Sequence, residues 1–144
     1  MNAQDVANYF LFMAGHDEED LISNLKLQKL LYYAQGFNLA LLDTPLFDNQ
    51  IEKWTHGPVV PDVYHQYKSF GNNPIDCPDE FSNEAFSPET LGLLEEVWSV
   101  FGQYTASALR NISHQEIPWK NADERGVISH ESMKEFFKSR IENG

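Results

Sequence analysis

The segment 24–42, NLKLQKLLYYAQGFNLALL, constrains the fold of this chain more than any other segment. Its apolar residues recur with the period of a helix, and they form one stripe: Leu27, Leu30, Leu31, Ala34, Phe37 and Leu41. Four further residues widen the stripe almost all round: Leu25, Tyr32, Leu39 and Leu42. A helix that is apolar on most sides must be covered on most sides, so we predict that it is central. Gly36 costs about 1 kcal/mol relative to alanine in mid-helix, which predicts close approach of a neighbouring helix.

The rest of the chain supplies covering helices. Four residues are suited to cap further amphipathic helices: Asn2, Ser87, Thr105 and Ser129. The acidic stretch 15–20, GHDEED, is expected to be a solvated loop. Only 51–54 (IEKW) and 126–129 (GVIS) favour an extended conformation, and we expect them to pair because an isolated strand leaves its backbone groups unpaired. The predicted fold is mainly α, a compact bundle of about six helices around the helix 24–42.

Length and composition predict one domain. A chain of 144 residues, 42% of them hydrophobic, is long enough to bury a single core without a disulfide or a metal. Its one cysteine, Cys77, cannot form an internal disulfide, which favours a reducing cytoplasm. The N-terminal residues are not typical of a leader peptide, and no apolar run reaches the ~18 residues of a membrane span. We therefore expect a single cytoplasmic domain, residues 1–144, that contacts no membrane.

The charge balance limits the class of partner. The chain carries 22 acidic and 10 basic residues, a formal net charge of −12. Nucleic-acid binding depends mostly on Lys and Arg contacts to phosphates, and the sequence shows no cluster of these residues, so a nucleic-acid partner is not expected. This also disfavours a transcriptional regulator with a helix-turn-helix. A basic protein is the partner that the charge favours.

The segment 51–68, IEKWTHGPVVPDVYHQYK, concentrates aromatic, imidazole, glycine and proline residues. Gly57 allows a positive φ, and Pro58 disfavours the helical conformation at the residue before it. Pro58 and Pro61 fit a helix entrance. Trp54 and Tyr64 each offer a large apolar surface with one polar group. The segment predicts a rigid corner that leads into a helix, and such a corner can also present a ligand-binding surface.

Signatures of catalysis are weak. The sequence has no glycine-rich phosphate loop, HExxH, paired CxxC or G-x-S-x-G. His114 and Glu116 have a spacing that suits metal ligands, and His56 could join them in space. Histidines in such a setting are more often hydrogen-bonding groups, so we expect no metal, no cofactor and no catalytic residue. The alternative is a small metal-dependent or acid–base enzyme that uses His56 and His114.

Three ordered motifs resemble the Panacea domain, the antitoxin domain of SocA-like and GepA-like phage-associated proteins. These are a K-L-Q-K-L-L-Y helix at 26–32, an I-x-x-W-x-x-G-P-V corner at 51–59, and a T/S-H-x-x-x-P-W element at 113–119. The resemblance extends from about residue 5 to residue 140. Ser113 stands where threonine is more usual in the family.

The resemblance implies an antitoxin that binds and neutralises a protein toxin encoded in an adjacent gene, and that acts in some relatives as an adaptor to a protease system. From the charge we expect this toxin to be basic. Because irregular segments need tertiary partners, we expect the corner and the third motif to meet in space. The residues expected to contact the partner are Trp54, His56, Tyr64, His114 and Trp119.

Overall fold

The computed structural model describes residues 1–15 and 21–143, so most of the predicted acidic loop 15–20 lies outside the described residues. The described chain is mainly α, as predicted, with seven α-helices: α1 (Ala3–Gly15), α2 (Asn24–Leu42), α3 (Pro61–Tyr67), α4 (Pro88–Phe101), α5 (Ala106–His114), α6 (Ile117–Lys120) and α7 (His130–Asn143). Two short strands, β1 (Glu52–Trp54) and β2 (Gly57–Val59), form a hairpin. The helix beyond the expected six is α6, a single turn within the third motif.

The predicted caps start the helices. Asn2 and Asp5 bond reciprocally, since each side chain accepts a hydrogen bond from the other residue's backbone N–H. Ser87 and Thr105 accept hydrogen bonds from backbone N–H groups three residues further on, at the starts of α4 and α5. Ser129 does the same for α7. These bonds satisfy N–H groups that the first turn of a helix leaves without partners.

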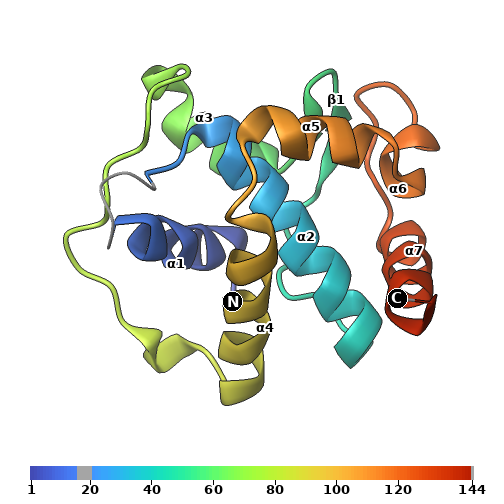
Figure 1. Ribbon diagram of the computed structural model, residues 1–144, viewed down its shortest axis with the longest axis horizontal. Coiled ribbons are helices and arrows are strands. Elements are labelled where there is room, and N and C mark those ends of the chain that lie inside the picture. Colours follow the sequence, from blue (N-terminus) through green and yellow to red (C-terminus); the bar gives the residue numbers. More distant parts are fainter. Residues whose placement is uncertain (16–20, 144) are drawn as a thin grey trace.

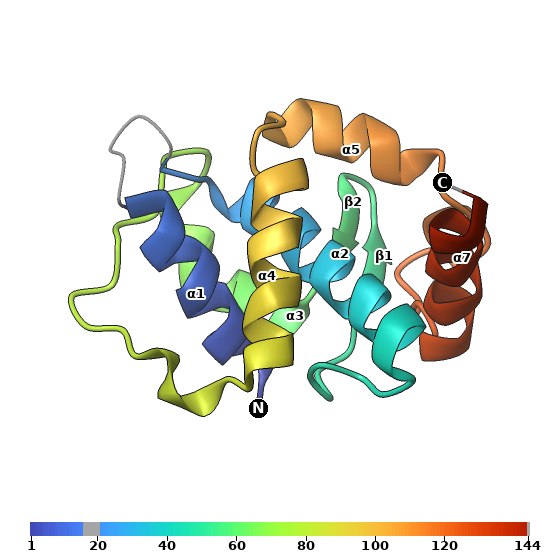
Figure 2. The same ribbon diagram turned by 60° about the horizontal axis from the view of Figure 1, so that its bottom comes forward.

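Helix α2 occupies the centre of the bundle (Figures 1 and 2). It contacts α1, α3, α4, α5, α7 and β2. The predicted burial is confirmed for Leu27, Leu30, Leu31 and Ala34, all fully buried. The prediction is wrong for the end of the stripe: Phe37 is only partly buried, and Leu41 and Leu42 are 56% and 40% exposed. The last turn of α2 reaches the surface of the bundle, where neighbouring helices cover less of it.

Gly36 permits the close approach that the sequence predicted. The neighbour is α7, whose Phe137 ring occupies the space that a side chain at position 36 would need. Phe137 is fully buried and also packs against Tyr32 and Tyr33, with ring centroids 5.5 and 5.9 Å apart. Glycine in α2 therefore lets the C-terminal helix dock on the central one.

The extended segments pair differently from the prediction. β1 pairs mainly with β2, in an antiparallel register that places Glu52 opposite Val59 and Trp54 opposite Gly57. The predicted pairing of 51–54 with 126–129 is present as one isolated bridge, Glu52 with Val127. Three backbone hydrogen bonds flank this bridge, including Ile128 N–H to Ile51 O at 2.7 Å. The strand β2 was missed because its sequence, Gly-Pro-Val, is typical of a turn.

None of the helices in the described part of the chain has the length and apolar character needed to cross a membrane.

Candidate functional site

Polar residues of α2 hold the other two motifs in place. Asn24 donates from its side-chain amide to the Tyr64 backbone oxygen at 3.0 Å, and Gln28 accepts from the Val60 N–H at 2.9 Å. A third bond, 2.8 Å from Gln28 Nε2 to Asn24 Oδ1, joins the two amides. Asn24 and Gln28 are buried, so these bonds have no competing water. They fix where α3 begins relative to α2.

Lys29 lies beneath the turn of the hairpin. Its side chain is fully buried, and its ammonium donates to the Pro58 oxygen at 3.2 Å. Gly57, at φ 116°, leaves the space that the lysine occupies, because a Cβ at position 57 would overlap Lys29 Cε. Burial, and secondly the nearby Arg110 charge, lower the pKa of Lys29 to about 7. Glycine is therefore required at position 57 for two reasons: the backbone has a positive φ, and a larger side chain would overlap the buried Lys29 side chain.

The third motif is anchored through Glu116. This carboxylate is 4% exposed and accepts from the Tyr32 and Tyr33 hydroxyls at 3.1 and 3.2 Å. Arg140 of α7 adds an ion pair at 3.1 Å. Burial raises the pKa of Glu116 to about 7, although these partners act in the opposite direction. Glu116 is therefore engaged in the core, facing the tyrosines and not forming a metal pair with His114.

The corner and the third motif meet, as predicted. Trp119 Nε1–H donates to the Trp54 backbone oxygen at 3.0 Å. The His114 ring stacks on Trp119 at a centroid separation of 4.0 Å and hydrogen-bonds to the Thr55 backbone. Burial, followed by the Arg110 charge, lowers the pKa of His114. The expected hydrogen-bonding role of His114 is confirmed.

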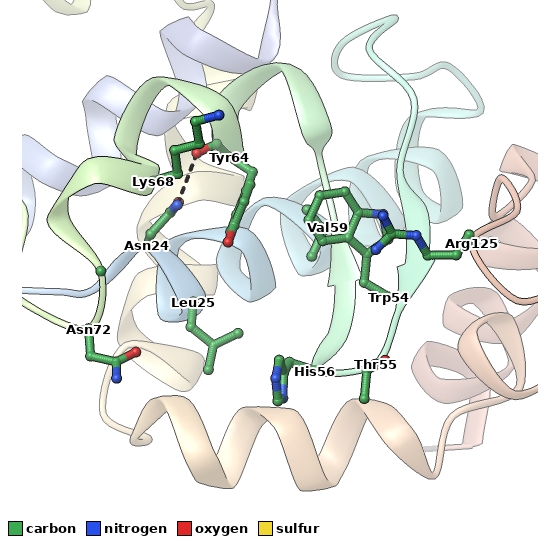
Figure 3. Close-up of a pocket in the computed structure, with 11 residues that line it drawn as sticks. Asn24, Leu25, Trp54, Thr55, His56, Val59, Tyr64, Lys68, Asn72 and Arg125 are labelled. Atoms are coloured by element: carbon green, nitrogen blue, oxygen red, sulfur yellow. Dashed lines mark hydrogen bonds between the residues drawn. The ribbon is translucent and has the colours of Figure 1, made fainter.

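A hollow of about 490 Å³ opens beside the hairpin. We call it the motif pocket (Figure 3), and it is lined by Asn24, Leu25, Trp54, Thr55, His56, Val59, Tyr64, Lys68, Gly71, Asn72 and Arg125. Three of the five predicted contact residues, Trp54, His56 and Tyr64, line it. His114 and Trp119 do not: they are partly buried and brace the turn through Thr55 and the Trp54 carbonyl.

Internal contacts order the aromatic wall of the motif pocket. The rings of Trp54 and Tyr64 meet edge to face, 4.9 Å apart and inclined by 70°. The Arg125 guanidinium lies over the Trp54 ring at 4.6 Å. The Trp54 indole N–H donates to Glu52 at 3.0 Å. An ordered amphipathic wall with charged neighbours suits the binding of a protein segment.

Sequence reasoning missed the cationic residues of this pocket. Lys68 follows α3, while Arg125 comes from the loop before α7, and both are exposed. They are far apart in sequence, so a search for clustered Lys and Arg could not find them. Lys29 and Glu116 carried a signal that could have been used: each is an ionisable residue inside a motif, followed directly by an apolar residue.

The arrangement of the candidate catalytic residues, His56 and His114, does not resemble a metal site or a nucleophile–base pair. In residues 1–15 and 21–143 no three His, Cys, Asp or Glu side chains gather closely enough to hold a metal ion. His56 is exposed in the hairpin turn, and His114 is stacked on Trp119. The arrangement presents a wall of side chains, and no nucleophile is paired with a base in it.

Comparisons with known proteins agree with the three motifs. The family model described as "Antitoxin SocA-like, Panacea domain" matches residues 27–120. The chain is also 34% identical over 136 residues to antitoxin SocA of Caulobacter vibrioides (strain NA1000 / CB15N), covering 83% of this chain and 69% of that protein. No solved structure matches the chain. The family match includes most of α2, the hairpin and the Glu116 element.

Proposed function

Because the chain belongs to the family of SocA-like antitoxins with a Panacea domain, we propose that it is an antitoxin that neutralises a cognate protein toxin by binding it directly. The observation that carries this proposal is the motif pocket. Each of the three motifs contributes to it or supports it, and the result is an ordered aromatic surface with an open hollow. Buried aromatic anchors in such hollows dominate the free energy of protein–protein binding.

Within this proposal, Trp54, His56 and Tyr64 contact the toxin, while His114 and Trp119 hold the turn that presents them. The protein acts by stoichiometric binding and without turnover. We propose further that residues 1–144 act as a single Panacea domain, since α1 and α7, which both lie wholly outside the matched range 27–120, pack on α2.

The toxin is expected to be basic overall and encoded in an adjacent gene. A net charge of −12 attracts a basic protein and accelerates its association. Screening beyond ~8–10 Å at physiological ionic strength will weaken the complex as salt rises. The same surface could present the bound toxin to a protease system, with this protein as the adaptor.

Co-expression with the neighbouring gene tests the proposal. The expected result is that growth is restored and that the two proteins co-purify. Tyr64→Ala should reduce both the growth rescue and the amount of co-purified toxin, because it removes an aromatic wall of the motif pocket. His130→Ala, which alters an exposed side chain at the start of α7, is the matched control and should behave like the natural sequence. If neither growth rescue nor co-purification occurs with a folded protein, the antitoxin proposal is wrong and the enzyme alternative gains support.

The protease role needs a separate measurement. The toxin's half-life in cells should shorten when this protein is present and lengthen again when the host's ATP-dependent proteases are deleted one at a time. An unchanged half-life alongside restored growth would leave neutralisation by binding in place and remove the adaptor role.

A further inference from the structure

The charges that line the motif pocket have the opposite sign to the rest of the molecule. Of 10 Lys and Arg residues, Lys68 and Arg125 line it, and His56 adds an imidazole. Of the 18 Asp and Glu residues in the described ranges 1–15 and 21–143, none lines it. In a chain with a net charge of −12, a hollow whose charged lining residues are all basic differs in charge from the average surface.

The basic side chains of the pocket have hydrogen-bond donors that are not used within the described structure. In the described structure, Lys68, His56 and Arg125 make no side-chain hydrogen bond or ion pair, although the Arg125 guanidinium lies over the Trp54 ring. Asn24, by contrast, uses both ends of its amide internally. The donor groups of these basic side chains are therefore available to bind an acceptor that carries negative charge.

Nearby carboxylates do not neutralise the pocket. Glu52 is engaged by the Trp54 indole N–H at 3.0 Å and does not line the hollow. Asp123 and Glu124 precede Arg125 in the same loop but are also outside the lining. The cations thus line an open hollow to which no acid of residues 1–15 or 21–143 contributes.

A second layer of basic groups lies behind the hairpin turn. Lys29 is fully buried, and the charge of Arg110 acts on both Lys29 and His114. Arg110 Nε and His114 Nε2 are buried atoms without a hydrogen-bond partner in the described structure. Arg110 therefore adds positive potential on the inner side of the turn that carries His56, whereas the lowered pKa values of Lys29 and His114 reduce the charge that these two groups contribute.

We propose that the motif pocket binds an acidic segment of the partner protein, with Asp or Glu carboxylates of that segment meeting the cations on its two sides, Lys68 and Arg125. This inference rests on the proposed antitoxin function and specifies the chemistry of its contact. A basic toxin is attracted by the acidic surface as a whole, and one acidic segment on it fixes the orientation, because only this hollow accepts it.

A protein segment fits the pocket better than a nucleotide does. Base recognition by stacking needs an open aromatic face. The Trp54 ring already contacts Arg125 at 4.6 Å and Tyr64 at 4.9 Å. The volume of about 490 Å³ lies within the range of roughly 300–1,000 Å³ that is common for ligand sites.

The test uses the full chain labelled with ¹⁵N and a synthetic probe, so it does not depend on the toxin. The probe is the peptide acetyl-Ala-Glu-Glu-Ala-amide, and its matched control is the isosteric acetyl-Ala-Gln-Gln-Ala-amide. The readout is the indole N–H resonance of each tryptophan, Trp54, Trp98 and Trp119. The Glu peptide should shift the Trp54 resonance in a saturable manner and leave Trp98, which does not line the pocket, unchanged.

Variants locate the effect. Lys68→Glu should weaken binding of the Glu peptide at least about tenfold, since it places like charges together. Its side chain supports no described contact, so the fold should persist, and Lys68→Gln gives a milder second variant. Lys138→Glu, which makes the same change at an exposed position of α7, should bind the peptide like the natural sequence.

Three results would overturn the proposal: equal shifts with the Gln peptide, an unchanged affinity in folded Lys68→Glu, or saturation by AMP at lower concentration than by the Glu peptide. The last result would make the hollow a nucleotide site. Growth rescue by the natural sequence separates the two proposals, because rescue without peptide binding keeps the antitoxin function and removes only the acidic segment.

Discussion

Two hollows lie beside opposite ends of α2, and they differ in how they are built. The motif pocket, near Asn24, is lined by cations, amides and two ordered aromatic rings, and buried hydrogen bonds position its walls. The second hollow, which we call the apolar hollow, lies between α2, α4 and α7 and has a volume of about 250 Å³. It is lined by Phe37, Leu41, Leu93, Glu96, Val97, Val100, Phe101 and Arg140.

The two hollows should differ in how specifically they bind a partner. A satisfied polar network imposes one geometry, because displacing any member leaves a buried group without its partner. Apolar surfaces accept many shapes, since their contacts have no direction. We therefore assign recognition to the motif pocket, and the following predictions test that assignment by comparing matched changes at the two ends of α2.

The largest effect is expected from Leu30→Ala. Leu30 is fully buried at the centre of α2, and its truncation should lower the free energy of unfolding by about 2–5 kcal/mol through lost burial and a cavity. The same change at Leu41, which is 56% exposed beside the apolar hollow, should alter it by no more than about 0.5 kcal/mol. Urea unfolding followed by circular dichroism measures both. Equal losses would mean that the last turn of α2 is part of the core after all.

A pH dependence of opposite sign is expected for Glu116, which contacts the middle of α2, and for Asp43, which follows its C-terminal end. Glu116, bonded to Tyr32 and Tyr33, has its pKa raised from 4.5 to about 7, so the folded protein binds the extra proton between these values. Its contribution is fully present below pH 4.5 and is lost as the pH rises through 7, a change of about 3 kcal/mol. Asp43 has its pKa lowered by Lys134, so its contribution is lost as the pH falls.

Unfolding free energies measured from about pH 3 to about pH 10 test these signs. Glu116→Gln should remove the decline toward neutral pH, whereas Asp43→Asn should leave that decline in place. Lys29, with its pKa lowered to about 7, binds its proton less well when folded, so stability should rise again from pH 7 toward 10.5. A decline that survives Glu116→Gln would show that another group causes it.

An intermediate effect is expected from Gly57→Ala. The new Cβ would overlap Lys29 and would sit on a backbone with φ 116°, at a cost of about 1–3 kcal/mol. Gly92→Ala is the matched control, because that glycine lies in α4 with open space around it and alanine should stabilise the helix by about 0.5–1 kcal/mol. Thermal unfolding compares the two. A neutral Gly57→Ala would mean that Lys29 can leave its place beneath the turn.

The helices were predicted well from the sequence, whereas the polar residues buried between them were not. The stripe of Leu27, Leu30 and Leu31 identified the buried face because burial follows the period of a helix. The same stripe overstated the end of α2, since periodicity does not show where neighbouring helices stop. Lys29 is fully buried although lysine rarely is, and only the structure shows the Pro58 carbonyl that receives it.

The candidate site was predictable in its aromatic half. Trp54 and Tyr64 stand in one short segment, and their size and polar groups suggested a binding surface. The basic side chains of the pocket were not predictable, because only the fold brings Lys68, after α3, and Arg125, in the loop before α7, to the lining of one hollow. The partner of β1 was likewise uncertain, since a three-residue strand carries too little pattern to choose between β2 and 126–129.

The smallest effect on stability, and the sharpest comparison of the two hollows, is expected from serine at Leu41 and at Tyr64. Leu41 is exposed beside the apolar hollow, so Leu41→Ser should change the unfolding free energy by no more than about 0.5 kcal/mol. If recognition belongs to the motif pocket, Leu41→Ser should also leave toxin co-purification and growth rescue intact, whereas Tyr64→Ser should reduce both, because Tyr64 forms a wall of that pocket against Trp54. The reverse result, binding lost with Leu41→Ser and kept with Tyr64→Ser, would move the toxin to the apolar hollow while leaving the antitoxin function itself untouched.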